Sequence, residues 1–132
     1  MDQADIFPKG DLASADYFTG TAWVKILLSS DAELPTQIYD VTFEPGARNH
    51  WHSHPGGQIL IVTQGKGYYQ EKGKPKQVIC RGDVVRIPAD VVHWHGATAD
   101  SAMTHIAIIP NTQPGTVAWM QAVTDEEYAA GN

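Results

Sequence analysis

Apolar and polar positions alternate in short runs along this chain, and a new run begins about every ten residues between Gly, Pro, Asp or Asn. Alternation with a period of two is typical of strands that bury one face. The runs predict strands over 21–29, 36–45, 58–65, 67–73, 76–80, 83–88, 91–97 and 103–110. "QGKG" at 64–67 and "RGD" at 81–83 are expected to be turns between them.

Helical patterns are confined to the two ends of the chain. Residues 11–18 are expected to form a helical turn, and 124–130 predict a short C-terminal helix with Thr124 as its N-cap and acidic residues in its first turn. Many short strands without helices between them favour an antiparallel sandwich or barrel. No linker or repeat interrupts the chain, so we expect one all-β domain over 1–132 with a barrel core at about 36–112.

The period-two pattern also predicts which side chains share a face of each strand. In the last long strand, His105 lies on an otherwise apolar face, and Tyr39 and Thr42 fall on opposite faces of theirs. A small barrel with polar groups on an apolar inner face is typical of a ligand cavity. The residues expected to line the cavity are Tyr39, Val41, Leu60, Met103 and Ile109.

Composition excludes several classes of partner. The formal charge is −6 and the nine Lys and Arg residues are scattered, which disfavours binding to nucleic acid or to an anionic membrane. No apolar run of 18 residues is present, and the acidic start at 1–14 has no apolar segment typical of a signal peptide. The single cysteine, Cys80, lies in the apolar run "QVIC" and is expected to be a buried, small hydrophobic residue. A lone thiol favours a cytoplasmic location.

Three histidines lie within five positions, in "HWHSHPGGQ" at 50–58. His52 and His54 are two residues apart, so in a strand both imidazoles project to one side. Gln58, after a Pro-Gly-Gly turn, can join them around a metal ion. A third histidine has to come from elsewhere in the chain, and the candidate is His93.

The spacing of these residues resembles two motifs of the cupin family. The first motif places a glycine six residues before His-x-His, an acid four residues after it, and another glycine seven residues further on. Here these positions hold Gly46, His52, His54, Gln58 and Gly65. The amide of Gln58 therefore stands where the family pattern has glutamate.

The second motif follows in the stretch 82–97. Gly82 begins it, Pro88 opens its Pro-x-Gly element, and the motif's histidine is His93. Asp90 departs from the family's glycine, and Ala97 departs from its asparagine. The resemblance implies a double-stranded antiparallel β-helix, that is a jelly-roll barrel, with a metal held by His52, His54, Gln58 and His93. The pattern assigns neither His50 nor His95 to the metal, and we expect Trp51 and Trp94 to pack on the opposite face.

A narrower resemblance covers nearly the whole chain. Stretches such as "VTFEPGARNHWHSHPGGQILIV" and "AMTHIAI" are similar to small bacterial cupins that include manganese-dependent hydroxynitrile lyases. Those proteins hold the metal with three histidines and a glutamine, and His105 matches their catalytic histidine. Tyr39 replaces a small residue of the lyases, and Ile109 replaces an amide. The resemblance implies one divalent ion, manganese before iron, nickel, zinc or cobalt, and a homodimer or homotetramer.

The neutral amide of Gln58 has a chemical consequence of its own. A glutamate ligand would leave a site of charge +1 with a divalent ion, whereas Gln58 leaves the full +2. A more electropositive centre is the stronger Lewis acid and lowers the pKa of a bound hydroxyl further. This favours Lewis-acid chemistry over redox cycling.

Three functions remain open on these grounds. The first is a lyase that acts on a small hydroxy or carbonyl compound, with cyanohydrin cleavage as its specific form and His105 as base. The second is a cupin dioxygenase that activates oxygen at the same metal. The third is a non-catalytic module that binds or senses a small ligand.

Overall fold

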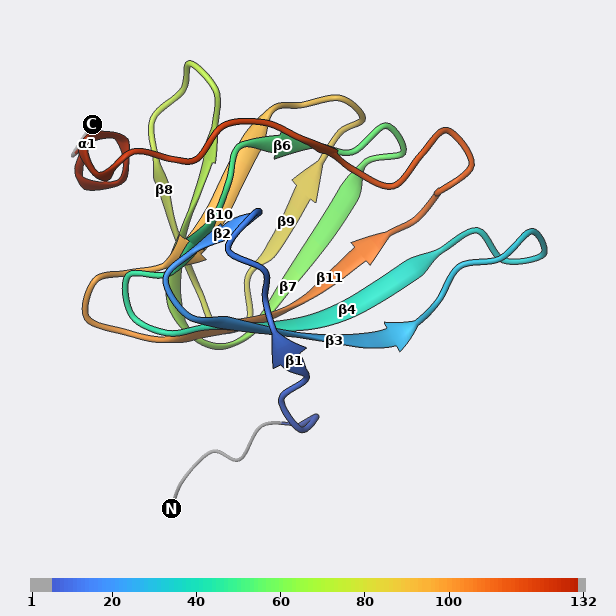
Figure 1. Ribbon diagram of the computed structural model, residues 1–132, viewed down its shortest axis with the longest axis horizontal. Helices are drawn as coiled ribbons and strands as arrows, with labels where there is room; N and C mark the ends of the chain where they lie inside the picture. Colours follow the sequence, from blue (N-terminus) through green and yellow to red (C-terminus); the bar gives the residue numbers. More distant parts are fainter. Residues whose placement is uncertain (1–5, 131–132) are drawn as a thin grey trace.

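The computed structural model describes residues 6–130, and strands are its main secondary structure (Figure 1). Residues 1–5, which belong to the acidic start considered above, and residues 131–132 lie outside the described residues. The strands are β1 (Asp11–Leu12), β2 (Phe18–Thr19), β3 (Ala22–Leu28), β4 (Gln37–Phe43), β5 (Arg48–Asn49), β6 (His52–Ser53), β7 (Gln58–Glu71), β8 (Gln77–Cys80), β9 (Val84–Ile87), β10 (His93–Ala97), β11 (Met103–Ile109) and β12 (Ala118–Trp119). The helix α1 spans Asp125–Ala129.

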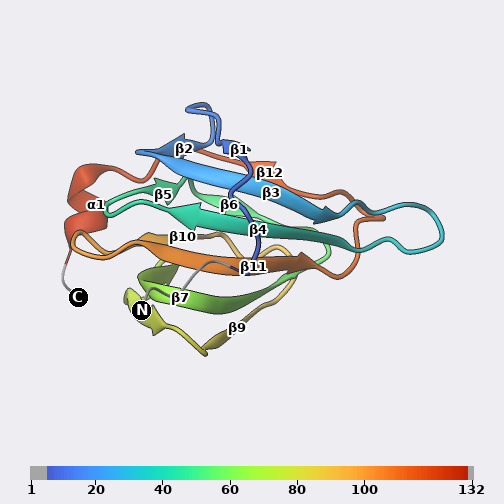
Figure 2. The same ribbon diagram turned by 90° about the horizontal axis from the view of Figure 1, so that it is seen from below.

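All strand pairs are antiparallel, and the sheet curls into a barrel whose two faces are joined by β7. The main path runs β1-β3-β4-β11-β7-β10-β5-β2. The first half of β7 pairs with β11 and β9, and its second half pairs with β10 and β8. Figure 2 shows β7 curving along one side of the barrel. The predicted fold class, an all-β jelly-roll barrel with a short C-terminal helix, is confirmed.

The predicted turn at 64–67 is wrong, because β7 is one strand from Gln58 to Glu71. Gly65 has a φ of 78°, and a Cβ there would lie 1.9 Å from the Ala102 carbonyl oxygen. Glycine is therefore needed for a close approach of two strands at this point. The turn at 81–83 is confirmed, with the Asp83 carboxylate accepting from the Cys80 amide at 2.8 Å. Residues 11–18 hold β1 and a turn ahead of β2 rather than a helical turn alone.

Two hydrophobic clusters stabilise the barrel. The larger lies inside it and includes Phe43, Leu60 and Met103, and the smaller contains Trp51, Trp94 and Val123. Both tryptophans are at most 3% exposed and belong to the smaller cluster, and Trp94 lies against Tyr68 and Tyr128, which fits the expectation that they pack on the face opposite the ligand histidines.

The prediction that Cys80 is buried is wrong. In β8 the alternation turns Ile79 inward, at 4% exposure, and so places its neighbour Cys80 outside. At the C-terminus, α1 begins with the predicted Thr124 N-cap. No helix of residues 6–130 is long and apolar enough to cross a membrane.

Candidate metal centre

Three histidines and one glutamine converge from separate elements at one end of the barrel. His52 lies on β6 directly opposite His93 on β10, His54 follows β6, and Gln58 begins β7. All four are at most 5% exposed. The ring centroids of His52 and His93 are 4.3 Å apart, and that of His54 lies 4.9 Å from His52 and 5.5 Å from His93. Between His54 and Gln58, the chain turns through Gly57, which has a φ of 81°.

Each of these imidazoles is fixed by a hydrogen bond from Nδ1 to a backbone carbonyl oxygen. His52 donates to His50 at 2.7 Å, and His93 donates to Val91 at 2.9 Å. His54 donates to Thr116 at 2.8 Å. A proton on Nδ1 leaves the lone pair on Nε2, so the three rings present the nitrogen that metal-binding histidines commonly use.

The donor atoms fit a divalent cation. Nε2 of His54 is buried and has no hydrogen-bond partner among the described residues, and Oε1 of Gln58 lies 3.3 Å from Nε2 of His93. Burial lowers the pKa of His93 to about 4 and holds that of His52 well below its usual value. Both rings are therefore neutral at pH 7, as metal ligands must be. Neutral nitrogen and amide-oxygen donors suit divalent transition metals.

His95 lies beside this group and enlarges the set of candidate donors. Ligand atoms of His52, His93 and His95 lie within 4.8 Å of one another. His95 also has two other neighbours. Nδ2 of Asn49 lies 3.2 and 3.3 Å from its two ring nitrogens, and Nδ1 of His95 lies 3.0 Å from Nε2 of His105. The Asn49 amide oxygen accepts from the His95 backbone N–H at 2.9 Å, which orients the amide toward the ring.

His105 is fully buried on β11, on the inward face that the alternation predicts. Burial lowers its pKa to about 4. With the hydrogen bond to His95, this places a neutral pair of imidazoles beside the three histidines described above. His50, by contrast, is only half-buried, and it contributes its backbone carbonyl to the site.

A cavity of about 220 Å³ opens onto His52, His54 and Gln58 and onto the His95–His105 pair, whereas His93 is buried behind them and does not line it. Tyr39, Val41 and Ile109 line it as expected, together with His105. Leu60 and Met103 do not, since both are fully buried within the core. Met103 packs against Gly67, where its sulfur lies 2.3 Å from the place a Cβ would occupy. Ala107, which the alternation places on the same face as His105, also lines it. Lining residues that local spacing did not indicate are Phe18, Val24, Asn49, Thr116, Val117 and Trp119.

These features define a small antiparallel barrel protein with a buried, histidine-rich site for a divalent metal ion. A cupin domain model matches residues 39–109. The chain belongs to the cupin family.

Individual relatives resemble the chain over most of its length. It is 46% identical over 114 residues to an (R)-mandelonitrile lyase of Granulicella tundricola, which covers 86% of this chain and 87% of the lyase. A cupin-like protein of Thermotoga maritima has 56% identity and a TM-score of 0.92, with 95% of each chain covered. A predicted oxalate decarboxylase of the same organism shares the fold, at 22% identity and a TM-score of 0.70 over 78% of this chain and 92% of that one.

Proposed function

We propose that this protein is a metal-dependent lyase that cleaves a carbon–carbon bond beside a hydroxyl group, and that its substrate is a small cyanohydrin. The observation that carries the proposal is the His95–His105 pair, which faces the same cavity as three of the four candidate metal ligands, His52, His54 and Gln58. The identity of 46% with an (R)-mandelonitrile lyase supports the specific reaction.

We assign the metal to His52, His54, Gln58 and His93. His54 supports this set because its Nε2 is buried without a partner, and Gln58 because its oxygen is directed at His93. His95 is a weaker candidate, since its ring already contacts Asn49 and His105. The ion we expect is manganese, with iron, nickel, zinc or cobalt as alternatives that share these donor preferences.

A divalent ion bound to this neutral donor set would supply Lewis-acid chemistry, which lowers the pKa of a substrate hydroxyl. The pKa of His105, about 4, makes it a weak base in the metal-free protein. The ring is therefore neutral at pH 7 and can accept a proton, and a hydroxyl made more acidic by the ion can be deprotonated by a weaker base. The two features of the site therefore suit one another.

His105 takes the hydroxyl proton in the proposed reaction. As the proton moves to the imidazole, the carbon–oxygen bond becomes a carbonyl and the bond to the nitrile carbon breaks. The same proton is returned to the departing cyanide, so the products are an aldehyde and hydrogen cyanide. His95 holds His105 in place through their hydrogen bond, and Asn49 in turn contacts the His95 ring.

The walls of the cavity restrict the substrate to a small, largely apolar molecule. Tyr39, Val41, Ala107 and Ile109 supply apolar surface, and about 220 Å³ is available. Apolar walls also exclude water from the reacting groups. Because Tyr39 and Ile109 are larger or less polar than their counterparts in the similar lyases, we expect the preferred cyanohydrin to differ from mandelonitrile in its side group.

The test is to load the purified protein with Mn²⁺ and to measure aldehyde and cyanide release from mandelonitrile and smaller cyanohydrins. His105→Gln should lower kcat by about 10²- to 10⁴-fold while metal content stays unchanged. His50→Gln is the matched control, because His50 lies outside the cavity, and it should retain activity. Absence of cyanide from every cyanohydrin tested would remove this function, and oxygen uptake by the iron-loaded protein would support the dioxygenase instead.

A further inference from the structure

The segment after β11 crosses the barrel and reaches the far side. Residues 111–123, the C-terminal strap, run past β6 to α1 (Figures 1 and 2). Within the strap, β12 pairs with β6, so that Trp119 lies opposite His52 and Ala118 opposite Ser53. A late part of the sequence is therefore placed directly beside the strand that carries the first metal ligands.

The strap supplies groups to the metal centre itself. The Thr116 carbonyl oxygen accepts the hydrogen bond from His54 Nδ1, and the Trp119 ring centroid lies 4.8 Å from that of His52. Thr116, Val117 and Trp119 also line the cavity. The strap thus forms one wall of the site and sets the tautomer of one of its histidines.

His54 differs from the other two candidate ligands in the origin of its hydrogen-bond partner. The carbonyls that fix His52 and His93 belong to residues only two positions away, so they are set by the local backbone. The carbonyl that fixes His54 is 62 positions away. His54 is therefore the ligand whose orientation depends on where another segment lies.

Few side chains of the strap are buried, so hydrophobic packing contributes little to holding it beside β6. Val123, at 2% exposure, is its one buried residue, and the others are half-buried or exposed. Its backbone is tied to the barrel at Trp51, whose carbonyl accepts from the Met120 amide at 2.9 Å and whose amide donates to Gln121 at 3.0 Å. Arg48 Nη2 donates to the Val123 carbonyl at 2.9 Å.

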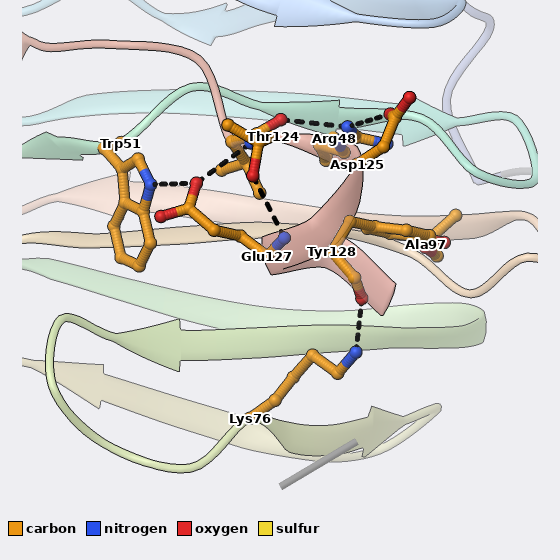
Figure 3. Close-up of polar contacts among 9 residues, drawn as sticks. Arg48, Trp51, Lys76, Ala97, Thr124, Asp125, Glu127 and Tyr128 are labelled. Carbon is orange, nitrogen blue, oxygen red and sulfur yellow. Dashed lines mark hydrogen bonds and ion pairs between the residues drawn. The ribbon is translucent and has the colours of Figure 1, made fainter. Parts of the chain in front are cut away.

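The far end of the strap is fixed by Glu127 of α1 (Figure 3). Its Oε1 accepts from the Thr124 amide at 2.9 Å, and the Thr124 hydroxyl accepts from the Glu127 amide at 3.0 Å. The same Oε1 accepts from Trp51 Nε1 at 3.2 Å. A helix of five residues is too short to be stable alone, so it depends on such contacts with the barrel. Tyr128, whose hydroxyl donates to the Ala97 carbonyl at 2.7 Å, and Asp125, which accepts from Arg48 at 2.9 Å, also dock α1, while the Glu127 carboxylate is the contact that reaches Trp51. Trp51 is the direct neighbour of His52, which links the helix to the ligand strand.

We infer that the C-terminal strap is a positioning element of the metal centre, and that Glu127 is the clasp that holds it against the ligand strand. The inference rests on the proposed metal site. Without the clasp the strap moves away from β6, His54 loses the carbonyl that fixes its tautomer, and the site binds metal less well. Glu127 itself touches none of the proposed ligands.

Four variants separate the hydrogen bonds of Glu127 from its charge. Glu127→Ala removes both bonds of the carboxylate, and Glu127→Gln keeps an oxygen that can accept them. Glu126→Ala removes the same charge from the same turn of the helix and is the matched control, since Glu126 is exposed. Trp51→Phe removes the indole donor together with part of a buried ring and leaves the paired bonds between Thr124 and Glu127 in place, so it tests the clasp if α1 cannot form in Glu127→Ala.

The measurements are amide hydrogen exchange at Met120, the His54 Nδ1–H signal in the NMR spectrum of the metal-free protein, and the Kd for Mn²⁺. We expect Glu127→Ala to speed exchange at Met120, to weaken the His54 signal and to raise the Kd about 10-fold, which is typical for loss of an outer partner of a metal ligand. Trp51→Phe should act in the same direction, while Glu127→Gln and Glu126→Ala should resemble the wild type.

Faster exchange at Met120 with an unchanged Kd would overturn the inference, because the strap would then move without affecting the site. Unchanged exchange at Met120 in both Glu127→Ala and Trp51→Phe would show that the clasp does not hold the strap. An equal effect in Glu126→Ala would assign the change to charge alone and also overturn it. A wild-type protein that binds no divalent metal would instead overturn the proposed function, which the exchange measurement does not depend on.

Discussion

The strands β4 and β11 run through both ends of the barrel. Their side chains form a packed core at one end and line the cavity at the other. β4 and β11 pair along their whole length, and the inward pairs are Phe43 with Met103, Val41 with His105, and Tyr39 with Ala107. At the first pair both side chains are large and fully buried. At the last pair the small Ala107 leaves space, and Tyr39 is half-buried at the cavity wall.

His105 lies on the boundary between these two ends. Its ring centroid is 5.4 Å from that of Phe43, which forms the floor beneath it, and its Nε2 contacts His95. The comparison shows that one alternation pattern can specify a packed core and a reactive cavity, because side-chain size decides which of them forms. Close packing around Phe43 and Met103 stabilises the fold. Around Tyr39 and Ala107 the packing is looser, which leaves the space that a bound ligand needs.

Truncation at the packed end should have the largest effect. Phe43→Ala is expected to lower the free energy of unfolding by about 3–5 kcal/mol, because it removes a fully buried ring and leaves a cavity. Tyr39→Ala should lower it by less than about 2 kcal/mol and should admit bulkier substrates. Urea denaturation of both variants measures the contrast. Equal losses in the two variants would contradict the division between the ends.

Removal of a proposed ligand should affect metal binding more than folding. His52→Ala is expected to raise the Kd for Mn²⁺ by about 100-fold or more, since loss of a ligand exceeds loss of its outer partner. Because His52 is buried and its ring lies against His93 and Trp119, the metal-free variant should also lose some stability, which thermal unfolding reports separately from the Kd. Calorimetric titration and thermal unfolding give both values. His50→Ala changes a histidine two residues earlier in the chain that is not a proposed ligand. It serves as the control and should bind metal normally.

The buried imidazoles should make the metal-free protein sensitive to acid. The folded-state pKa values of His93 and His105, about 4, lie below the ordinary value of 6.5. The unfolded chain therefore takes up protons first, so the stabilisation is fully present above pH 6.5 and is lost as the pH falls toward 4. Each of the two histidines contributes a slope of about 1.4 kcal/mol per pH unit within this window. Urea midpoints measured between pH 4.5 and 7.5 test the slope, and a flat profile would contradict the burial of neutral rings.

Replacing the Gln58 amide by a carboxylate should change metal affinity and reaction rate less than loss of a ligand does. It tests whether the neutral donor suits the cavity end to Lewis-acid chemistry. Gln58→Glu adds one negative charge to the proposed donor set, so we expect tighter binding of Mn²⁺ by about 10-fold and slower cyanohydrin cleavage. Metal titration and kcat measure the two quantities. A variant that binds metal more tightly and also cleaves faster would show that the neutral amide is not what suits the site to Lewis-acid chemistry.

Much of this architecture could be predicted from the sequence because it depends on local patterns. Alternation predicts the long strands and the inward face of β11, the spacing of His52 and His54 predicts their shared direction, and Thr124 with Glu127 forms the helix start. Each of these features is decided by residues within a few positions of one another.

The parts that were not predicted depend on contacts between distant segments. Gly65 has the appearance of a turn residue, but it is required by the carbonyl of Ala102 on another part of the chain. Leu60 and Met103 share parity with the cavity residues, yet their depth along the barrel places them in the core. Trp119 and Asn49 reach the cavity from short strands that carry no periodic signal of their own.

The hydrogen bond from His54 to Thr116 has a consequence for biosynthesis. A ribosome adds residues in order, so all four proposed ligands leave it before the carbonyl that orients His54 and before the helix that secures the strap. A nascent chain that already contains every ligand should therefore hold the ion poorly. Tight binding of the metal then requires that synthesis has passed the strap and α1, and shorter nascent chains should compete weakly for the ion.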